Sequence, residues 1–213
     1  LMIANVLFFA VSYAIYFALS RMLGSAAEFG IYGIVISLVS LVSTVLVAGT
    51  EQVVSKFVSE TPSSAEAVKC AALRMQLLVS IGVFFLYFLS APFIALLLND
   101  SSLTPLMQFS ALIIVFHPLF SVFIGHLNGL RRFARQARLC ITYQVSRIVL
   151  ILGMVALGFG VFGAVGGFVM ASFFGMMLGY MLSYSGRSQS AFPLRKLLGF
   201  SAPLMLFAAA LNT

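Results

Sequence analysis

An all-α bundle of membrane helices is the fold class that this sequence predicts, and three observations predict it. Hydrophobic residues make up 62% of the 213 residues and charged residues only 8%, whereas a typical soluble domain has about 25% charged residues. The charge-free stretches are long enough for helices that cross a bilayer, which need about 20 apolar residues each. The Lys and Arg residues lie in short islands between these stretches. Lipid is therefore the expected surroundings of most of the chain.

Six charge-free stretches follow one another along the chain, at residues 1–20, 29–50, 75–99, 101–130, 148–186 and 197–213. The fifth stretch has 39 residues, which is too long for one membrane helix and right for two. Its expected break is the glycine cluster Gly158, Gly160 and Gly163, because glycine disfavours helix. The sequence thus predicts six transmembrane helices plus the start of a seventh.

The chain begins at Leu1 with a hydrophobic run and no basic segment before it. This pattern differs from a signal peptide, and we expect a first membrane helix whose short head is cut away. Two cysteines, Cys70 and Cys140, offer no disulfide framework, and with two histidines they predict no zinc site. The net charge of +7 does not predict nucleic-acid binding, because a duplex needs a dense face of Lys and Arg.

Basic loops indicate the orientation, because Lys and Arg are enriched on the cytoplasmic side of membrane proteins. The loops after the second, fourth and sixth predicted spans hold ten Lys and Arg residues. The other three loops hold only Arg21, and Arg147 is left inside the fifth span. This asymmetry predicts a multi-pass protein of the cytoplasmic membrane with a cytoplasmic N-terminus.

Catalysis needs acids, bases or nucleophiles that converge, and the sequence indicates no such group. The acidic residues fall in predicted loops or at predicted helix ends: Glu28, Glu51, Glu60, Glu66 and Asp100. His117 and His126 have no acid or cysteine near them in the sequence. We therefore predict no enzyme, no metal and no cofactor. For His117, which precedes Pro118, capping of a carbonyl freed by the proline is favoured over proton relay.

A small residue recurs at every fourth position of the predicted sixth span: Gly163, Gly167, Ala171, Gly175 and Gly179. We call this row the small-residue stripe. Membrane helices associate through close backbone contact at such residues. Tight packing inside the bundle is favoured over a dimerisation seam.

Arg147 is the candidate substrate-binding residue with the clearest physical argument. A charge at its depth in a span is unfavourable unless it meets water or a partner. Gln144 and Tyr143, three and four residues earlier, share its helix face. Arg147 could extend back to the cytoplasmic headgroups, or it could form the cationic wall of a hydrophilic cavity. The cavity is favoured, because the sequence offers no carboxylate within a span.

Two further polar residues could extend the same surface, Asn5 in the first span and Lys56 just past the second. Each could instead be an interface residue, and Lys56 could be a solvated loop residue. Arg131, Arg135 and Arg138 share one helix face and are interpreted as an orientation signal on anionic lipid.

Several local strings occur in a specific order. They are SRMLG at 20–24, EFGIY at 28–32, GTEQVVSKF at 49–57, GHLNGLRRF at 125–133, GVFGA at 160–164 and SAPL at 201–204. This succession resembles the polysaccharide and O-antigen flippases of the multidrug/oligosaccharidyl-lipid/polysaccharide exporter superfamily.

The resemblance implies two helix bundles that are related by a pseudo-twofold axis along the membrane normal and rock about a central cavity. It implies an N-terminal lobe at residues 1–185, a cytoplasmic linker at 186–196 and the start of a truncated C-terminal lobe at 197–213. Cations in the cavity of such flippases meet the diphosphate of the lipid carrier. Arg147, Arg21 and Lys56 are the matching residues.

The expected function is therefore transport of a polyprenyl-diphosphate-linked oligosaccharide or polysaccharide precursor by alternating access. Its expected partners are the bilayer, the anionic lipid-linked glycan and the C-terminal lobe. Two alternatives stay open. A cation-coupled multidrug exporter of the same superfamily is disfavoured, because that branch tends to use a membrane-embedded acid. A scaffold subunit without transport would have no wet cavity.

Overall fold

The protein is helical throughout the part of the chain that the structure, a computed structural model, describes: residues 2–183 and 192–211. Because no strand occurs in these residues, the all-α prediction is confirmed. The α-helices are α1 (Met2–Met22), α2 (Ala26–Glu60), α3 (Ala65–Leu97), α4 (Leu103–Gly129), α5 (Phe133–Met154), α6 (Gly160–Leu182) and α7 (Leu194–Leu211). Short helical turns are η1 (Pro62–Ser64) before α3 and η2 (Val155–Phe159) before α6.

Helices α2 and α3 are longer than the charge-free stretches that predict them. The sequence places a loop at residues 51–74, yet α2 continues to Glu60 and α3 begins at Ala65. The 35 residues of α2 correspond to about 52 Å of helix at 1.5 Å per residue, which exceeds the roughly 30 Å of bilayer hydrocarbon. The length of a charge-free stretch predicts only the part of a helix that lipid can surround. Backbone hydrogen bonds continue the helix beyond that part. The loop prediction for this segment is therefore wrong.

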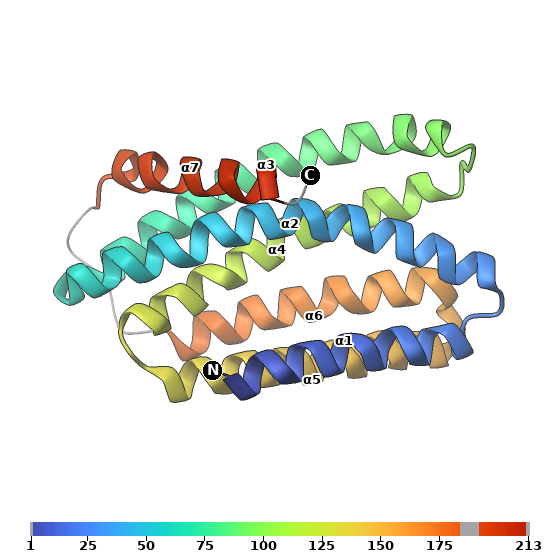
Figure 1. Cartoon of the computed structure of the whole chain (residues 1–213), viewed down its shortest axis with the longest axis horizontal. Helices are drawn as coiled ribbons and strands as arrows, with labels where there is room; N and C mark the ends of the chain where they lie inside the picture. Colours follow the sequence, from blue (N-terminus) through green and yellow to red (C-terminus); the bar gives the residue numbers. More distant parts are fainter. Residues whose placement is uncertain (1, 184–191, 212–213) are drawn as a thin grey trace.

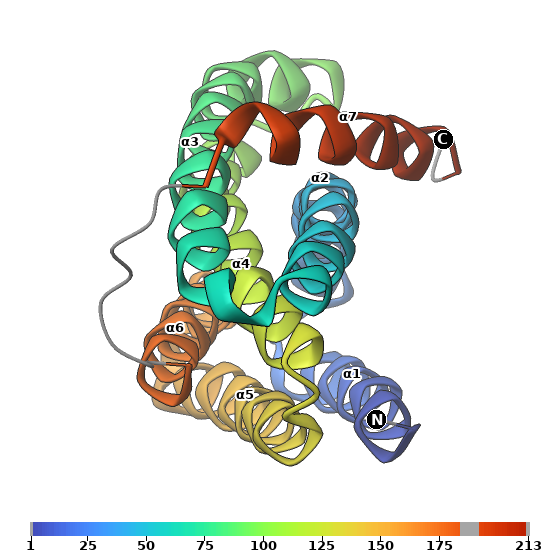
Figure 2. The same ribbon diagram turned by 90° about the vertical axis from the view of Figure 1, so that its left-hand side faces the viewer.

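Helix α4 lies at the centre of the bundle. It packs against α2, α3 and α6, while α5 packs on α6 and α1 packs mainly on α5 (Figure 2). Helix α1 has few contacts with α2. Residues of five helices, α1, α2, α4, α5 and α6, line one cavity of the bundle.

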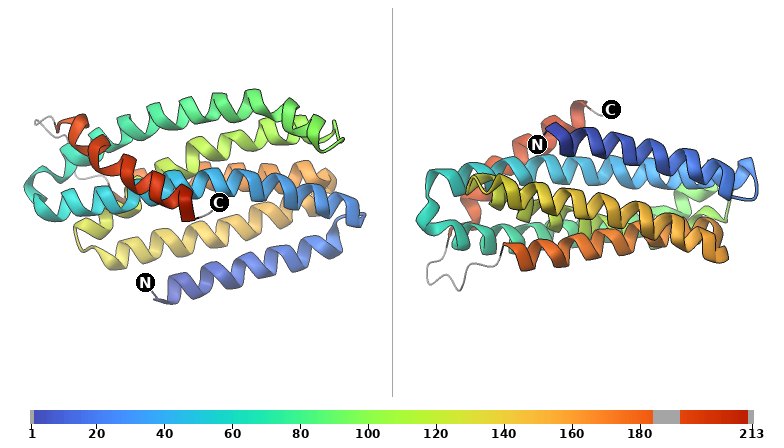
Figure 3. Two further views of the ribbon diagram at one scale, coloured as in Figure 1. Left: turned by 45° about the horizontal axis from the view of Figure 1, so that its top comes forward. Right: turned by 90° about the horizontal axis from the view of Figure 1, so that it is seen from below.

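The connections alternate between the two ends of the bundle. The turns after α1, α3 and α5 lie at one end, and those after α2 and α4 lie at the other (Figures 1 and 3). Arg131 and Arg132 lie in the turn after α4, Arg135 lies in the first turn of α5, and Arg195 and Lys196 lie in the first turn of α7. These segments belong to the second end, together with the C-terminus of α6 (Figure 1). This arrangement agrees with the even-numbered basic loops that the sequence predicts on one side.

Glycine separates α5 from α6 at the predicted position. Gly158 has φ 91° and Gly160 has φ 53°, a left-handed region that other residues rarely adopt. The chain reverses there and α6 returns along α5 (Figure 1). The predicted break within residues 148–186 is confirmed.

The small-residue stripe of α6 packs against α5 and α4. A Cβ atom on Gly167 would lie 2.5 Å from the Ile151 Cα atom, and one on Gly179 would lie 2.6 Å from the Phe123 ring. Ala171 is fully buried. The prediction of tight packing inside the bundle is confirmed, because the stripe lets the α6 backbone approach its neighbours.

Helix α7 packs on α2 and α3, away from α1, α5 and α6 (Figure 2). Gly49 of α2 permits this approach, because a Cβ there would meet the Met205 side chain and the Ser201 carbonyl. Helix α7 begins three residues before the predicted position 197. Of the predicted linker at 186–196, residues 186–191 lie outside the described part. The division into two lobes stays a prediction.

Five stretches of the described residues are long and apolar enough to cross a membrane: Ala26–Glu60, Pro62–Leu97, Leu103–Gly129, Phe133–Leu182 and Leu194–Leu211. The fourth stretch contains both α5 and α6, which the glycine turn divides. A multi-pass membrane protein follows from these stretches. The count of six spans plus the start of a seventh stays a prediction.

Candidate functional site

A cavity of about 230 Å³, lined by both polar and apolar groups, lies between α1, α2, α4, α5 and α6. Helices α1, α2, α4 and α5 each contribute residues about one or two turns apart, so that one face of each points to the same space, and α6 contributes Phe168. The lining residues are Ser12, Tyr16, Ile36, Ser40, Ser43, Thr44, Ile113, His117, Tyr143, Arg147 and Phe168. These residues combine hydroxyls, aromatic rings and one guanidinium group. We call this space the Arg147 cavity.

Arg147 lies inside the bundle and not at its surface. It is 8% exposed. One guanidinium nitrogen, Nη2, donates to the Ser12 hydroxyl at 3.4 Å, and the other, Nη1, donates to Gln144 Oε1 at 3.5 Å. The guanidinium carbon lies 4.9 Å from the centroid of the Phe168 ring. These contacts join α5 to α1 and α6 and hold the cation at the cavity wall.

The polar face that the sequence predicts on α5 is present. Tyr143 and Gln144 are both 4% exposed, and they lie on the side of α5 that carries Arg147. Tyr143 lines the cavity, while Gln144 contacts Arg147 from within the same helix. The spacing of three and four residues brings these groups together because they are neighbours on a helix surface.

Helix α2 presents hydroxyl groups to the Arg147 cavity. Ser40, Ser43 and Thr44 follow Ile36 at helical spacing and line it with Ile36. Ser43 is 3% exposed, and its hydroxyl oxygen is buried without a hydrogen-bond partner among the described residues. Thr44 donates to the Ser40 carbonyl at 2.8 Å. The sequence analysis did not single out these residues, because serine and threonine are common small residues at helix contacts within membranes.

His117 meets the cavity through a stack of aromatic rings. Its ring centroid lies 5.9 Å from that of Tyr143 and 6.2 Å from that of Phe120, at interplanar angles of 25° and 20°. Its Nδ1 atom is buried without a hydrogen-bond partner among the described residues. The expected cap on a carbonyl freed by Pro118 is therefore not made by this atom.

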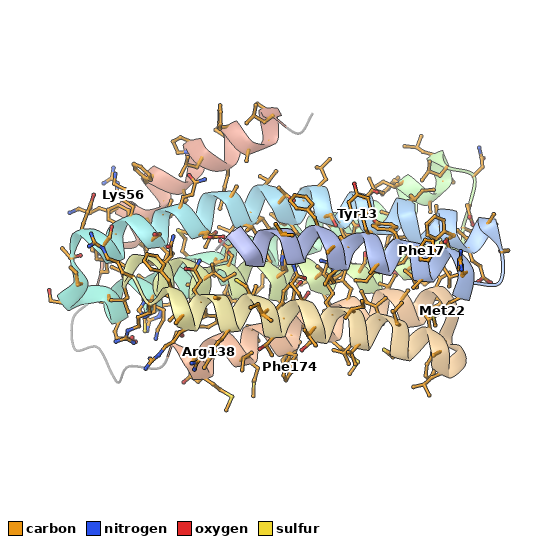
Figure 4. The ribbon with its side chains drawn as sticks, turned by 60° about the horizontal axis from the view of Figure 1, so that its bottom comes forward. Tyr13, Phe17, Met22, Lys56, Arg138 and Phe174 are labelled. Carbon is orange, nitrogen blue, oxygen red and sulfur yellow. The ribbon has the colours of Figure 1, made fainter. Side chains whose placement is uncertain are left out.

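The other predicted cations lie away from the cavity. Arg21 is exposed at the end of α1, with its guanidinium carbon 4.4 Å from the Phe17 ring centroid. Lys56 lies near the opposite end of the bundle, 3.9 Å from Glu60 and 3.7 Å from the Phe200 ring centroid (Figure 4). The structure does not bring Arg21 or Lys56 to Arg147. Asn5 belongs to α1, but its side chain lies outside the described residues.

A buried ionic cluster, which we call the Lys69 cluster, joins α3, α4 and α6. The Lys69 ammonium lies 2.7 Å from Glu66 Oε2 and donates to the Ser183 carbonyl at 2.7 Å. His126 Nε2 lies 3.4 Å from Glu66 Oε1. The side chains of Lys69 and His126 are 5% and 0% exposed. Sequence analysis missed this cluster because its members are 57 or more residues apart, apart from the i,i+3 pair Glu66 and Lys69.

Two acidic residues differ from their expected surroundings. Glu66 lies in the first turn of α3, as expected of a helix end, but its side chain is only 19% exposed because it packs beside His126. Glu51 lies within α2, nine residues before the helix ends, and not at a helix end. The prediction of a helix end at Glu51 is wrong because α2 continues past its charge-free part to Glu60.

The cavity suits a ligand that is anionic and rich in oxygen. Among the described lining residues Arg147 is cationic and none is a carboxylate, so the local field favours negative charge. A guanidinium presents several N–H donors in a planar fork that fits phosphate oxygens. Hydroxyls can both donate and accept hydrogen bonds. Binding of a phosphate-containing group is therefore the chemistry that these residues support.

The sequence comparisons identify the family to which this arrangement belongs. A profile of the polysaccharide biosynthesis protein family matches residues 18–212, which include every described residue that lines the cavity except Ser12 and Tyr16. No curated protein matches the chain. Because the match covers most of its length, the chain belongs to the polysaccharide biosynthesis protein family.

Proposed function

We propose that this protein is a flippase, which moves a polyprenyl-diphosphate-linked oligosaccharide or polysaccharide precursor across the cytoplasmic membrane by alternating access. The observation that carries the proposal is the position of Arg147, a buried cation at the wall of a cavity that hydroxyl groups also line, inside a membrane bundle. Family membership supplies the connection to polysaccharide synthesis.

A charge inside a membrane protein marks a functional site by default, because it is unfavourable there unless a ligand, water or partner compensates. The contacts of Arg147 with Ser12, Gln144 and Phe168 orient the guanidinium at the cavity wall. A diphosphate supplies negative charge and several acceptor oxygens. We therefore assign Arg147 as the phosphate-binding residue, with Tyr143 lining the same site and Gln144 as a positioning residue.

The alternating-access part of the proposal rests on the bundle and on the resemblance to flippases. A cavity that opens toward one end of the bundle at a time exposes the substrate headgroup to one side of the membrane. We propose that the N-terminus and the basic loops face the cytoplasm, and that a second lobe completes the transport path. Transport of this kind requires no catalytic residue, so the proposed protein is not an enzyme.

Transport of a fluorescent polyprenyl-diphosphate-linked oligosaccharide by the full-length protein in proteoliposomes tests the proposal. We expect Arg147→Ala to lower the transport rate by about 10-fold or more, because a hydrogen-bonded charge contact is lost. Arg147→Lys should recover part of the rate, since the charge returns but the planar fork does not. Arg138→Ala is the matched control, because Arg138 is an exposed cation on the same helix (Figure 4).

The alternatives give different results in the same assay. A multidrug exporter would move a cationic dye and not the lipid-linked glycan. A scaffold subunit would move neither substrate. Wild-type transport by Arg147→Ala at normal protein levels would exclude the assigned role of Arg147.

A further inference from the structure

The hydroxyl-bearing face of α2 gives the Arg147 cavity a second recognition surface beside the guanidinium group of α5. It consists of Ser40, Ser43 and Thr44, which come from a different helix than Arg147. We call it the α2 hydroxyl face.

Ser43 is the residue of this face that gives the strongest indication of a bound ligand. Its side chain is almost fully buried at 3% exposure, it lines the cavity, and its oxygen has no hydrogen-bond partner among the described residues. Buried hydroxyls nearly always have a partner, because burial without one is unfavourable. A hydrogen-bonding group bound inside the cavity can satisfy this oxygen.

The size of the cavity limits what that ligand can be. Sites that enclose a drug-sized molecule occupy about 300–1,000 Å³, and this cavity of about 230 Å³ falls below that range. An oligosaccharide does not fit inside it. A phosphate with an adjoining sugar ring matches both its size and its chemistry.

Arg147 and the α2 hydroxyl face suit different parts of this ligand. Phosphate oxygens accept hydrogen bonds and carry negative charge, which suits the donors of Arg147. Sugar hydroxyls both donate and accept, which suits serine and threonine hydroxyls. The rings of Tyr16, Tyr143 and Phe168 add apolar surface to the same cavity, and such surface covers the C–H groups of a sugar ring.

We propose that the α2 hydroxyl face, centred on Ser43, binds the sugar that is joined directly to the phosphate. The Arg147 cavity then recognises the sugar–phosphate junction of the substrate, and the rest of the glycan lies outside it. This inference rests on the proposed function, because it names the part of the lipid-linked substrate that the same cavity selects.

Binding to the purified full-length protein tests the inference with two soluble probes, glucose 1-phosphate and inorganic pyrophosphate, by calorimetry. We expect Ser43→Ala to weaken glucose 1-phosphate binding by about 3- to 10-fold, the loss of one neutral hydrogen bond. Pyrophosphate binding should be unchanged in this variant. Arg147→Ala should weaken binding of both probes.

Ser37→Ala is the matched control. Ser37 lies one turn before Ser40 on α2, but it is exposed and lines a separate apolar groove with Gly30, Gly33 and Ile34. Binding of both probes should be unchanged in this variant. A loss equal to that of Ser43→Ala would mean that the effect comes from α2 packing, and it would overturn the inference.

The remaining outcomes separate the inference from the proposed function. If wild-type protein transports the lipid-linked glycan but Ser43→Ala weakens both probes equally, or neither, the sugar subsite is wrong and the flippase proposal stands. Failure of the wild type to bind glucose 1-phosphate also overturns the subsite. If Ser43 discriminates between the probes but no transport occurs, the subsite stands and the flippase proposal fails.

Discussion

The Lys69 ammonium donates a 2.7 Å hydrogen bond to the carbonyl oxygen of Ser183, the residue that caps the C-terminus of α6. The last carbonyls of a helix lack partners within it and carry partial negative charge. Lys69 reaches them from α3, while Glu66 holds the same ammonium at 2.7 Å. The end of α6 is thus fixed to α3 by a buried charge.

Removal of the Lys69 charge should destabilise the protein strongly. Lys69→Met leaves Glu66 beside an apolar side chain, and breaking a buried ion pair costs about 3–5 kcal/mol. The double variant Lys69→Met/Glu66→Gln should lose less stability than Lys69→Met alone, because no uncompensated charge remains. Unfolding of the protein in detergent, followed by temperature or denaturant, measures both.

The matched control is Lys56→Met. Lys56 and Glu60 form an exposed pair at 3.9 Å, with side chains 42% and 53% exposed, and such pairs contribute about 0–1 kcal/mol. Equal losses from Lys69→Met and Lys56→Met would contradict the buried role of the Lys69 cluster.

Gly167→Ala and Gly82→Ala should change stability in opposite directions. A Cβ on Gly167 would lie 2.5 Å from Ile151 Cα, whereas a Cβ on Gly82 meets nothing within 4 Å. Overpacking costs about 1–3 kcal/mol, while alanine in an open helix position gains up to about 1 kcal/mol. The larger changes Gly167→Leu and Gly175→Leu should prevent normal accumulation. Normal accumulation of both leucine variants would show that the small-residue stripe does not pack tightly against α4 and α5.

Cysteine labelling should place the basic end of the bundle in the cytoplasm. In a protein whose Cys70 and Cys140 are replaced by alanine, we expect Ser101→Cys to react with an impermeant reagent added to intact cells. Arg135→Cys should react only after permeabilisation, because the basic loops stay inside. Labelling of Arg135→Cys in intact cells would reverse the proposed orientation.

Local rules predicted the parts of the fold that depend on nearby residues. The break at Gly158 and Gly160 follows from the backbone freedom of glycine, and the packing of Gly167 follows from a four-residue repeat. The shared face of Tyr143, Gln144 and Arg147 follows from helix periodicity. Each needs only the geometry of one helix or turn.

Tertiary contacts were beyond these rules. Nothing in the sequence near Glu66 indicates that His126 lies beside it, because helix packing brings them together. In the sequence, Ser43 is one of many small residues in predicted spans. Its role is visible only in the structure, where residues of α1 and α5 line the same cavity. Charge-free counting also misses the full length of α2, since the helix continues through Glu51 and Lys56.

The final prediction separates Arg147 from the other two cations that the resemblance to flippases implies. Arg21 lies nine residues beyond Ser12 on α1, roughly 13 Å further along the helix axis. Lys56 lies twelve residues beyond Thr44 on α2, roughly 18 Å along that axis. Both side chains are exposed. Neither residue lines the Arg147 cavity.

In the proteoliposome assay, Arg21→Ala and Lys56→Ala should therefore retain about half or more of wild-type transport, and their small losses should shrink at high salt, because salt screens exposed charges. The loss in Arg147→Ala should persist at high salt, since buried charges are screened much less. Transport measured at low and high ionic strength for the three alanine variants checks both statements. If Arg21→Ala or Lys56→Ala matched the loss of Arg147→Ala at both ionic strengths, the substrate path would include that end of the bundle and binding would not be confined to the cavity.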